Sequence, residues 1–270
     1  MRRTLLPLAL ALFCSSALAD GAAPVDVLVD LGASGHDMEY DEARDRLYVS
    51  VPSSDKLVVV DTNNWQVVQE LTIAPDPHGV ALSLDGTRLF VAKRGAGSVA
   101  VVDLATWTQS EILLTTELDS ALTYDVVEAT PDRLYVSANP GSGGFAYIVQ
   151  VALDQGNVAQ RVASNRIIRC NPTFEVSPDQ TALYVGACFS PNSLYKLDLT
   201  QPDAPIIAED DHGSVFGTGH LETSPDSSRV YLASGQVVES TGIQVVGQIG
   251  PGISRFETDP TRIFVAVTPG

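Results

Sequence analysis

Arg88-Leu89-Phe90-Val91-Ala92 is the stretch that decides the fold of this 270-residue chain. It is one of six copies of a pattern in which a basic or small residue is followed by an aliphatic, an aromatic, an aliphatic and a small residue. The other copies are residues 46–50, 133–137, 182–186, 229–233 and 262–266. The first aliphatic residues of successive copies lie 42, 45, 49, 47 and 33 residues apart. Such a period, built from strand formers and turn residues, is typical of four-stranded propeller blades.

The second repeat shows the order of segments that we expect in every blade: a first strand, a turn, the aromatic marker strand, a third strand and an outer strand. In this repeat the five segments are His78–Ser83, Leu84–Thr87, Arg88–Ala92, Val99–Asp103 and Thr108–Leu114. An Asp-Gly or Pro-Asp turn between two strand-like runs marks a tight hairpin. We therefore predict an all-β fold, a β-propeller of four-stranded antiparallel blades over residues 20–270, with six visible repeats of which the last is truncated.

The two ends of the repeat region bear on the number of blades. Val25–Leu31 is similar to an outer strand and stands before the first complete repeat, whereas the chain stops after the second strand of the sixth. Propellers usually close by letting one terminus complete the blade that the other begins, which removes exposed sheet edges. We interpret the sequence as a piece of a six- or seven-bladed protein.

Residues 1–19 have the features of a secretory signal peptide. Arg2 and Arg3 form a positive segment, Leu5–Phe13 an apolar core, and Ala17-Leu18-Ala19 a cleavage site of small residues before Asp20. The apolar run is too short to span a bilayer. We expect cleavage near Ala19 and a periplasmic or secreted protein without membrane insertion.

The charge of the chain limits its partners. The sequence has 16 basic and 33 acidic residues, and removal of Arg2 and Arg3 with the signal leaves a net charge of −19. Nucleic acids and anionic membrane surfaces would repel such a protein. Cations, basic partners and neutral small molecules remain possible ligands.

Cys170 and Cys188 are the cysteines that remain after cleavage, in an oxidising compartment. Residues 171–177 and 182–188 read as two strands of a hairpin around the turn at 178–181. Opposed residue numbers in this hairpin sum to about 358 or 359, and those of the two cysteines sum to 358. We therefore predict a structural disulfide in the fourth blade. A redox pair is the alternative, although no neighbouring residue would lower a thiol pKa.

Residues 77–92, Pro-His-Gly-Val-Ala-Leu-Ser-Leu-Asp-Gly-Thr-Arg-Leu-Phe-Val-Ala, followed by Ser-Val-Ala-Val-Val-Asp at 98–103, resemble the YVTN family of β-propeller repeats. The likeness covers nearly all of residues 24–270. It implies membership of a superfamily with lactonase-like propellers and the propeller parts of amine dehydrogenases, nitrite reductase and nitrous oxide reductase. It further implies export and, in most relatives, seven blades. It implies no particular activity.

In such folds the first strand of each blade lines the central channel, and a carboxylate recurs on these strands. Aligned on the marker strand, one equivalent position is held by Glu39, Ala81, Glu128, Glu175, Glu222 and Glu257. Five carboxylates in one confined space repel one another, so they must be hydrated, partly protonated or neutralised by a cation. Ligands that are all oxygens favour a hard ion such as Ca²⁺. The five glutamates are thus a candidate metal site, with a water-filled polar channel whose charge Arg255 and its neighbours balance as the alternative.

His36 and His78 occupy the same position at the start of the first strand, at the channel mouth. Imidazoles above a ring of carboxylates could bind a metal or act as acid and base, and these two are the candidate catalytic residues if the protein is an enzyme. A structural turn element is the alternative. Motifs for covalent haem, a Gly-x-Ser-x-Gly nucleophile and a phosphate-binding loop are absent from the sequence.

Three functions follow from these features. The first is an exported, non-catalytic propeller that binds a small molecule, a cation or a protein partner at its channel face. The second is a divalent-cation-dependent lactonase or ring-opening lyase in which channel glutamates hold the cation and His36 or His78 takes the proton. The third is the propeller subunit of a periplasmic dehydrogenase, whose partner chain would carry the cofactor.

Overall fold

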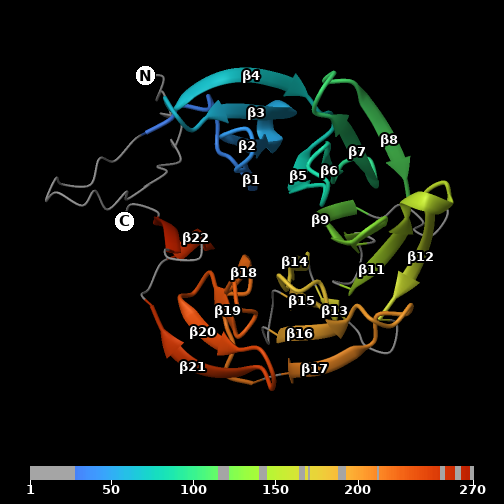
Figure 1. The fold of residues 1–270 in the computed structure, drawn as a ribbon, viewed down its shortest axis with the longest axis vertical. Helices are drawn as coiled ribbons and strands as arrows, with labels where there is room; N and C mark the ends of the chain where they lie inside the picture. The colour runs from blue at the N-terminus through green and yellow to red at the C-terminus, as the bar shows by residue number, and fades with distance from the viewer. Residues whose placement is uncertain are drawn as a thin grey trace, which may run out of the picture.

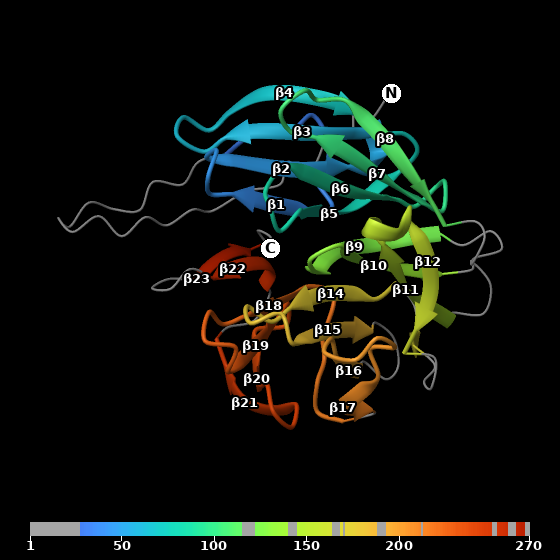
Figure 2. The same cartoon turned by 45° about the vertical axis from the view of Figure 1, so that its right-hand side comes forward.

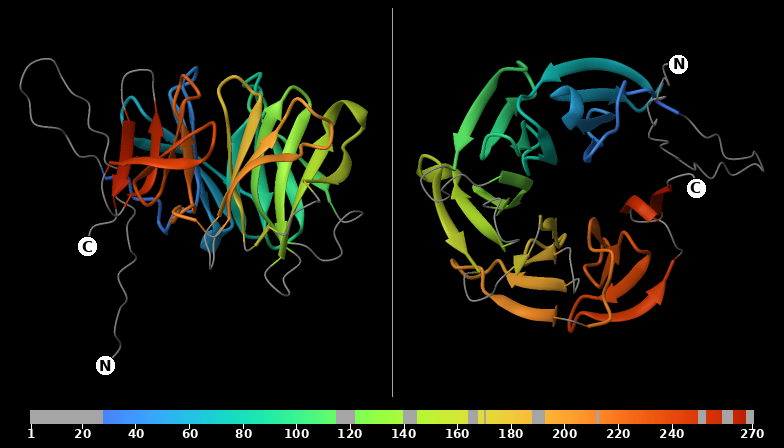
Figure 3. Two further views of the ribbon diagram at one scale, coloured as in Figure 1. Left: turned by 90° about the horizontal axis from the view of Figure 1, so that it is seen from below. Right: turned by 180° about the vertical axis from the view of Figure 1, so that it is seen from behind.

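A computed structural model describes residues 28–114, 122–139, 145–163, 168–169, 171–187, 193–211, 213–249, 253–258 and 263–267. In these residues six antiparallel sheets follow one another around a central axis in the order of the sequence (Figure 1). The predicted β-propeller architecture is therefore confirmed. Viewed from the side, the sheets form a disc, and the first strand of each sheet faces its centre (Figure 3).

Each blade is a meander whose strands pair in chain order (Figure 2). The first blade contains β1 (Met38–Asp41), β2 (Arg46–Val51), β3 (Lys56–Asp61) and β4 (Gln66–Thr72). The second contains β5 (Pro77–Leu82), β6 (Arg88–Lys93), β7 (Ser98–Asp103) and β8 (Gln109–Leu113). The third contains β9 (Leu122–Thr130), β10 (Arg133–Asn139), β11 (Phe145–Ala152) and β12 (Val158–Val162), with the short β13 (Ile168–Arg169) also paired to β11.

The remaining blades continue the same order. The fourth contains β14 (Thr173–Val176), β15 (Ala182–Ala187), β16 (Ser193–Asp198) and β17 (Ile206–Asp211). The fifth contains β18 (Leu221–Thr223), β19 (Arg229–Leu232), β20 (Gln236–Glu239) and β21 (Gln244–Gln248). In the sixth the structure describes β22 (Ile253–Thr258) and β23 (Ile263–Val267). Two 3-10 turns, η1 (Pro52–Ser54) and η2 (Leu153–Gln155), follow β2 and β11.

The repeated aromatic residue is the centre of each blade's packing. Tyr48, Phe90, Tyr135 and Tyr184 lie on the second strands and are at most 1% exposed. Each aromatic ring packs against the next blade, and alternation along the strand sends its aliphatic neighbours to the opposite face, where they pack against the preceding blade. The tyrosine hydroxyls keep polar partners: Tyr48 donates to Asp41, and Tyr135 accepts a hydrogen bond from Gln150. Burial of both faces explains why the marker motif is apolar throughout.

The hairpin turns carry a second repeated device. In three blades a serine hydroxyl donates to the aspartate two residues later. That aspartate also accepts the backbone N–H of the residue two positions beyond it. The pairs are Ser83–Asp85, Ser177–Asp179 and Ser224–Asp226. These aspartates belong to the Pro-Asp and Asp-Gly turns that the sequence predicts. The local hydrogen bonds close the hairpin and hold the register of the strands that face the channel.

Two predictions about particular segments have different outcomes. Of the stretch Val25–Leu31, the structure describes residues 28–31, and these form no strand. Val29 and Leu31 instead pack against the core of the first blade. In the fourth blade the predicted register is confirmed, since Phe174 pairs with Val185 and Glu175 with Tyr184. Cys170 and Cys188 lie outside the described residues, so their disulfide remains a prediction.

Within the described residues, no helix has both the length and the apolar character needed to cross a membrane.

Candidate functional site

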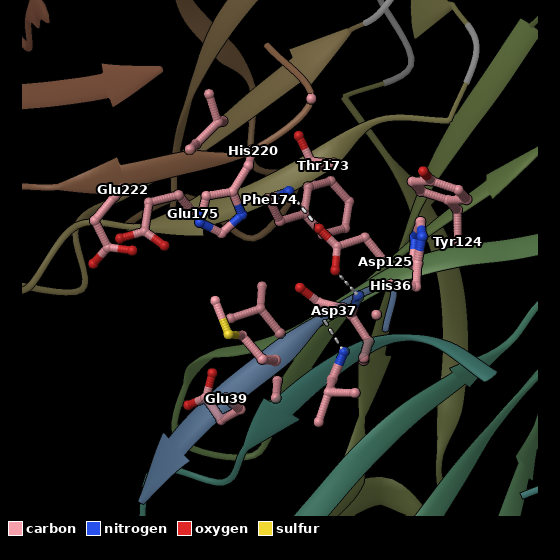
Figure 4. A pocket seen from close by; sticks show the side chains of 18 of the residues that line it. His36, Asp37, Glu39, Tyr124, Asp125, Thr173, Phe174, Glu175, His220 and Glu222 are labelled. Atoms are coloured by element: carbon pink, nitrogen blue, oxygen red, sulfur yellow. Dashed lines mark hydrogen bonds between the residues drawn. The ribbon is translucent and has the colours of Figure 1, made fainter. Parts of the chain in front are cut away.

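The first strands of the first five blades enclose a cavity of about 350 Å³ on the axis of the disc. Its walls come from residues 36–40, 79–81, 124–127, 173–175 and 219–222, and Figure 4 shows most of these side chains. The placement follows from the predicted blade order, because the innermost strand of each sheet is the one that reaches the centre. The cavity is the candidate site.

The strand registers divide the wall of the cavity into two levels. At the first level, near the mouth, each residue lies opposite the last residue of the marker motif; its members are Asp37, Asp125, Thr173 and His220. At the second level each residue pairs with the aromatic residue of the motif; its members are Glu39, Ala81, Val127, Glu175 and Glu222. Members of the two levels are two residues apart, which corresponds to about 6.6 Å along a strand.

The first-level aspartates connect neighbouring blades. Asp37 Oδ2 accepts the backbone N–H of Val80 at 2.7 Å, and Asp125 Oδ2 accepts that of Phe174 at 2.6 Å. Figure 4 shows both carboxylates directed toward the cavity beside these bonds. Each carboxylate is therefore held in a fixed position near the mouth.

Three of the predicted glutamates line the second level. Glu175 Oε1 accepts hydrogen bonds from the N–H and the hydroxyl of Thr223 in the next blade, at 3.0 and 2.7 Å. Glu39 and Glu222 lie at the same level on β1 and β18. Glu257 pairs with Phe264, which gives it the equivalent register position on β22. Arg255, two residues earlier, pairs with Ala266 and holds the first-level position.

Glu128 is not part of this ring, contrary to the prediction. Register shifts in β9 make Val127 the partner of Tyr135, whereas Glu128 pairs with Leu134 and turns away from the cavity. The Glu128 side chain is 4% exposed, and its Oε2 accepts the N–H of Leu84 in the second blade. The register skips one residue between Thr130, which pairs with Arg133, and Glu128, so alignment from the marker strand reached Glu128 where the structure has Val127.

Three rings meet at the mouth of the cavity. The centroids of His36 and His78 are 4.2 Å apart, and Tyr124 lies 5.2 Å from His36 and 5.1 Å from His78. His36 and Tyr124 line the cavity, whereas His78 is 5% exposed and lies behind them. Nδ1 of His78 donates to the carbonyl oxygen of Asp76 at 3.2 Å, and burial lowers the pKa of this imidazole. His78 is therefore a neutral supporting group.

Sequence reasoning missed Tyr124 and Asp125. The bulge in β9 displaces both residues relative to an alignment made from the marker strand. The structure shows the correspondence directly, because Asp125 N–H donates to the hydroxyl of Ser137 as Asp37 N–H donates to that of Ser50. The two pairs are 12 and 13 residues apart, so alignment from the marker strand does not match Asp125 with Asp37.

The wall of the cavity is strongly acidic. Among the described residues that line it are five carboxylates, Asp37, Glu39, Asp125, Glu175 and Glu222, and no lysine or arginine. These carboxylates come from four different blades. No group of three or more His, Cys, Asp or Glu side chains in the described part of the chain has an arrangement suited to holding a metal ion. The cavity thus favours positive charge without forming a compact coordination sphere in this arrangement.

Known structures share this architecture. No protein-family model matches the chain, and no curated protein sequence does. A gluconolactonase from Xanthomonas campestris is 17% identical with a TM-score of 0.66, and the match covers 98% of this chain and 96% of that one. Hydrazine synthase from Kuenenia stuttgartiensis is 15% identical with a TM-score of 0.65, over 86% of this chain and 73% of that one.

The β-propeller domain of Cps50 (Swd1) from Myceliophteria thermophila is 15% identical with a TM-score of 0.56, over 86% of this chain and 70% of that one. These three proteins are described as a gluconolactonase, a hydrazine synthase and a β-propeller domain of Swd1, so one fold is shared by proteins with different functions, as is common among propellers. The comparisons thus agree with the sheet order and show that this chain has the β-propeller fold.

Proposed function

We propose that this protein is an exported, YVTN-type β-propeller that binds a positively charged ligand in its central cavity and acts as a binding protein. The observation that carries the proposal is the cavity of about 350 Å³ whose described lining contains five carboxylates and no lysine or arginine. The residues of the signal-like segment and the net charge support export and argue against nucleic acid as the ligand.

The electrostatics of the wall explain why a cation would be retained. Carboxylates held around one enclosed space repel one another, and a bound cation relieves that repulsion. Asp37, Asp125 and Glu175 are fixed by hydrogen bonds to neighbouring blades, so they cannot simply turn away from the cavity. Because these bonds form without a ligand, little ordering of the protein is needed for binding.

The test is the melting temperature of the protein in chelator, with CaCl₂ and with 1,4-diaminobutane, at constant ionic strength. A ligand at ~100 times its dissociation constant that binds only the folded state adds about 2.7 kcal/mol, which raises the melting temperature by several degrees. We expect a rise with at least one cation, and a smaller rise in Glu222→Gln. The matched control is Glu42→Gln, because Glu42 is exposed in the β1–β2 turn. No rise with either cation would refute the proposal.

A divalent-cation-dependent lactonase is a second candidate, favoured by the match of the gluconolactonase over 96% of its length. In that case Glu39, Glu175 and Glu222 would have to converge from their present spread to hold a divalent cation, which would polarise the ester carbonyl. His36, which lines the cavity, would accept the proton of the attacking water, with the neutral His78 packed behind it.

This candidate is tested by hydrolysis of glucono-δ-lactone with Ca²⁺ present. Glu175→Gln and His36→Ala should each abolish turnover, whereas Glu42→Gln should leave it unchanged. Binding of Ca²⁺ without hydrolysis by the unmodified protein would refute lactonase activity for this substrate and leave the binding function standing.

A further inference from the structure

We infer that the ligand of the cavity is a short aliphatic diammonium ion, bound along the axis of the disc, rather than a metal ion. This inference rests on the proposed function, since it requires that the cavity bind a cation. Three features of the described residues carry it: the two levels of carboxylates, the spread of those carboxylates around the wall, and the rings at the mouth.

The two levels match two charges that are joined by a short chain. Asp37 and Asp125 stand at the first level, and Glu39, Glu175 and Glu222 at the second. The levels are separated by two strand residues, or about 6.6 Å. An extended chain of four or five methylene groups places two nitrogen atoms at a comparable separation. One ammonium group can therefore reach each level in a single orientation along the axis.

The spread of the carboxylates disfavours a metal ion. A calcium ion takes six to eight oxygen ligands at about 2.3–2.6 Å, so its ligands must converge on one point. The described side chains show no such group of three. In addition, one oxygen each of Asp37, Asp125 and Glu175 accepts a backbone N–H of the adjacent blade. Alkylammonium groups, which donate up to three separate hydrogen bonds, suit carboxylates that are dispersed around a wall.

The mouth of the cavity adds a surface for one ammonium group. The ring of Tyr124 lies beside Asp125, and His36 meets it nearly at right angles, with an interplanar angle of 79° (Figure 4). An aromatic face next to a carboxylate attracts an organic cation through the ring quadrupole while it excludes water. A hydrated divalent ion gains little from such a face. The rings therefore favour an alkylammonium ion at the first level.

The cavity is also large for a bare ion and sufficient for this ligand. Its volume is about 350 Å³, whereas one water occupies about 30 Å³ of liquid. The chain between the two nitrogens would run past Met38 and Ala81, which supply apolar wall beside the charged groups. Alternating apolar and acidic surfaces of this kind complement a molecule with charged ends and an apolar middle.

The experiment is a set of calorimetric titrations of the full protein with 1,4-diaminobutane, n-butylammonium and CaCl₂. We expect the diamine to bind with one-to-one stoichiometry and at least about tenfold more tightly than the monoamine, since each ammonium adds charge-assisted hydrogen bonds. Asp37→Asn, which retains an acceptor oxygen for Val80, and Glu222→Gln should each bring the diamine close to the monoamine. Tyr124→Leu should weaken the diamine and leave the affinity for Ca²⁺ unchanged, and Glu42→Gln should change nothing.

The outcomes separate the two proposals. If Ca²⁺ binds and the diamine does not, or if the monoamine equals the diamine, the inference is overturned while cation binding stands. If no cation binds, the proposed function fails and the inference fails with it. Melting temperatures of the variants identify any that do not fold. If Asp37→Asn and Tyr124→Leu at the mouth do not fold, the diamine affinity of Glu222→Gln at the half-buried second level tests the inference.

Discussion

The first strands of the third and fourth blades, β9 and β14, come from matching parts of the repeat and have different surroundings. In β14 the register is unbroken, so Glu175 reaches the cavity opposite Tyr184. In β9 two register shifts put Val127 at that place and turn Glu128 toward the second blade. Because side chains alternate along a strand, a displacement of one residue moves a carboxylate from the cavity to the space between blades.

The two strands consequently have different tasks. β9 is packed closely onto the second blade, through Asp125 against Gly79 and Glu128 against the turn at Leu84. β14 is attached to the following blade by the hydrogen bond that Glu175 accepts from Thr223, and Glu175 also lines the cavity. We therefore expect substitution of Glu128 on β9 to change mainly stability, and substitution of Glu175 on β14 to change mainly binding.

Gly79→Ala should have the largest effect on stability. A Cβ at this position would stand 2.7 Å from the Cα of Asp125 and 3.0 Å from the carbonyl oxygen of Tyr124, both of them backbone atoms of β9. The strand would have to move, at a cost of about 2–3 kcal/mol. The melting temperature should fall by roughly 5–10 °C, as measured by circular dichroism.

Gly219→Ala is the matched control for this substitution. Gly219 also lines the cavity, but a Cβ there meets no atom within 4 Å. Its melting temperature should stay within about 1 °C of the unmodified protein. Equal losses in the two variants would show that the close approach of β9 to the second blade is not what stabilises this part of the ring.

Glu128→Ala should lower mainly the stability of the protein, whereas Glu175→Ala should weaken mainly its binding of cations. Loss of the buried Glu128 carboxylate leaves the Leu84 N–H without its acceptor and should lower the unfolding free energy by about 1–3 kcal/mol. Glu175 lines the cavity, from which water can reach the buried Thr223 N–H that loses its acceptor, so its removal should cost less, about 1 kcal/mol. Chemical denaturation and cation titration of both variants make the comparison. If Glu128→Ala weakens cation binding more than Glu175→Ala does, the assignment of the two carboxylates is wrong.

The same comparison shows what could be predicted from the sequence. The marker motif, the Asp-Gly and Pro-Asp turns and the strand order could be predicted because each is a local pattern that burial or hydrogen bonding imposes in one blade after another. Glu39, Glu175 and Glu222 were placed correctly for the same reason. Glu128, Asp125 and Tyr124 depended on where β9 takes up its extra residues, and packing between blades decides that. The sequence of β9 contains no glycine that would mark the bulge.

The two strands also differ at the mouth of the cavity. Tyr124 of β9 adjoins two imidazoles, whereas the equivalent residue before β14 is Pro172. The smallest predicted effect concerns the pH dependence of stability that arises from this ring cluster. Burial lowers the pKa of His78, although Asp76 and Asp37 oppose this shift and Arg94 supports it. As the pH falls below the ordinary value of 6.5, the unfolded chain binds this proton before the folded protein does. The stabilisation is therefore complete above pH 6.5 and is lost as the pH falls toward the lowered pKa.

His78→Phe keeps a ring beside His36 and Tyr124 and removes this titration. The slope of unfolding free energy against pH just below 6.5 should become flatter, by at most about 1.4 kcal/mol per pH unit for a single proton. Hydrogen bonds from Ser83 and Thr87 lower the pKa of Asp85 to about 2, so this carboxylate contributes only at much lower pH. Urea denaturation at pH 7.5, 6.5 and 5.5 measures the slope. An unchanged slope in His78→Phe would assign the pH dependence to another group, and His36 in the same ring cluster would be the next to replace.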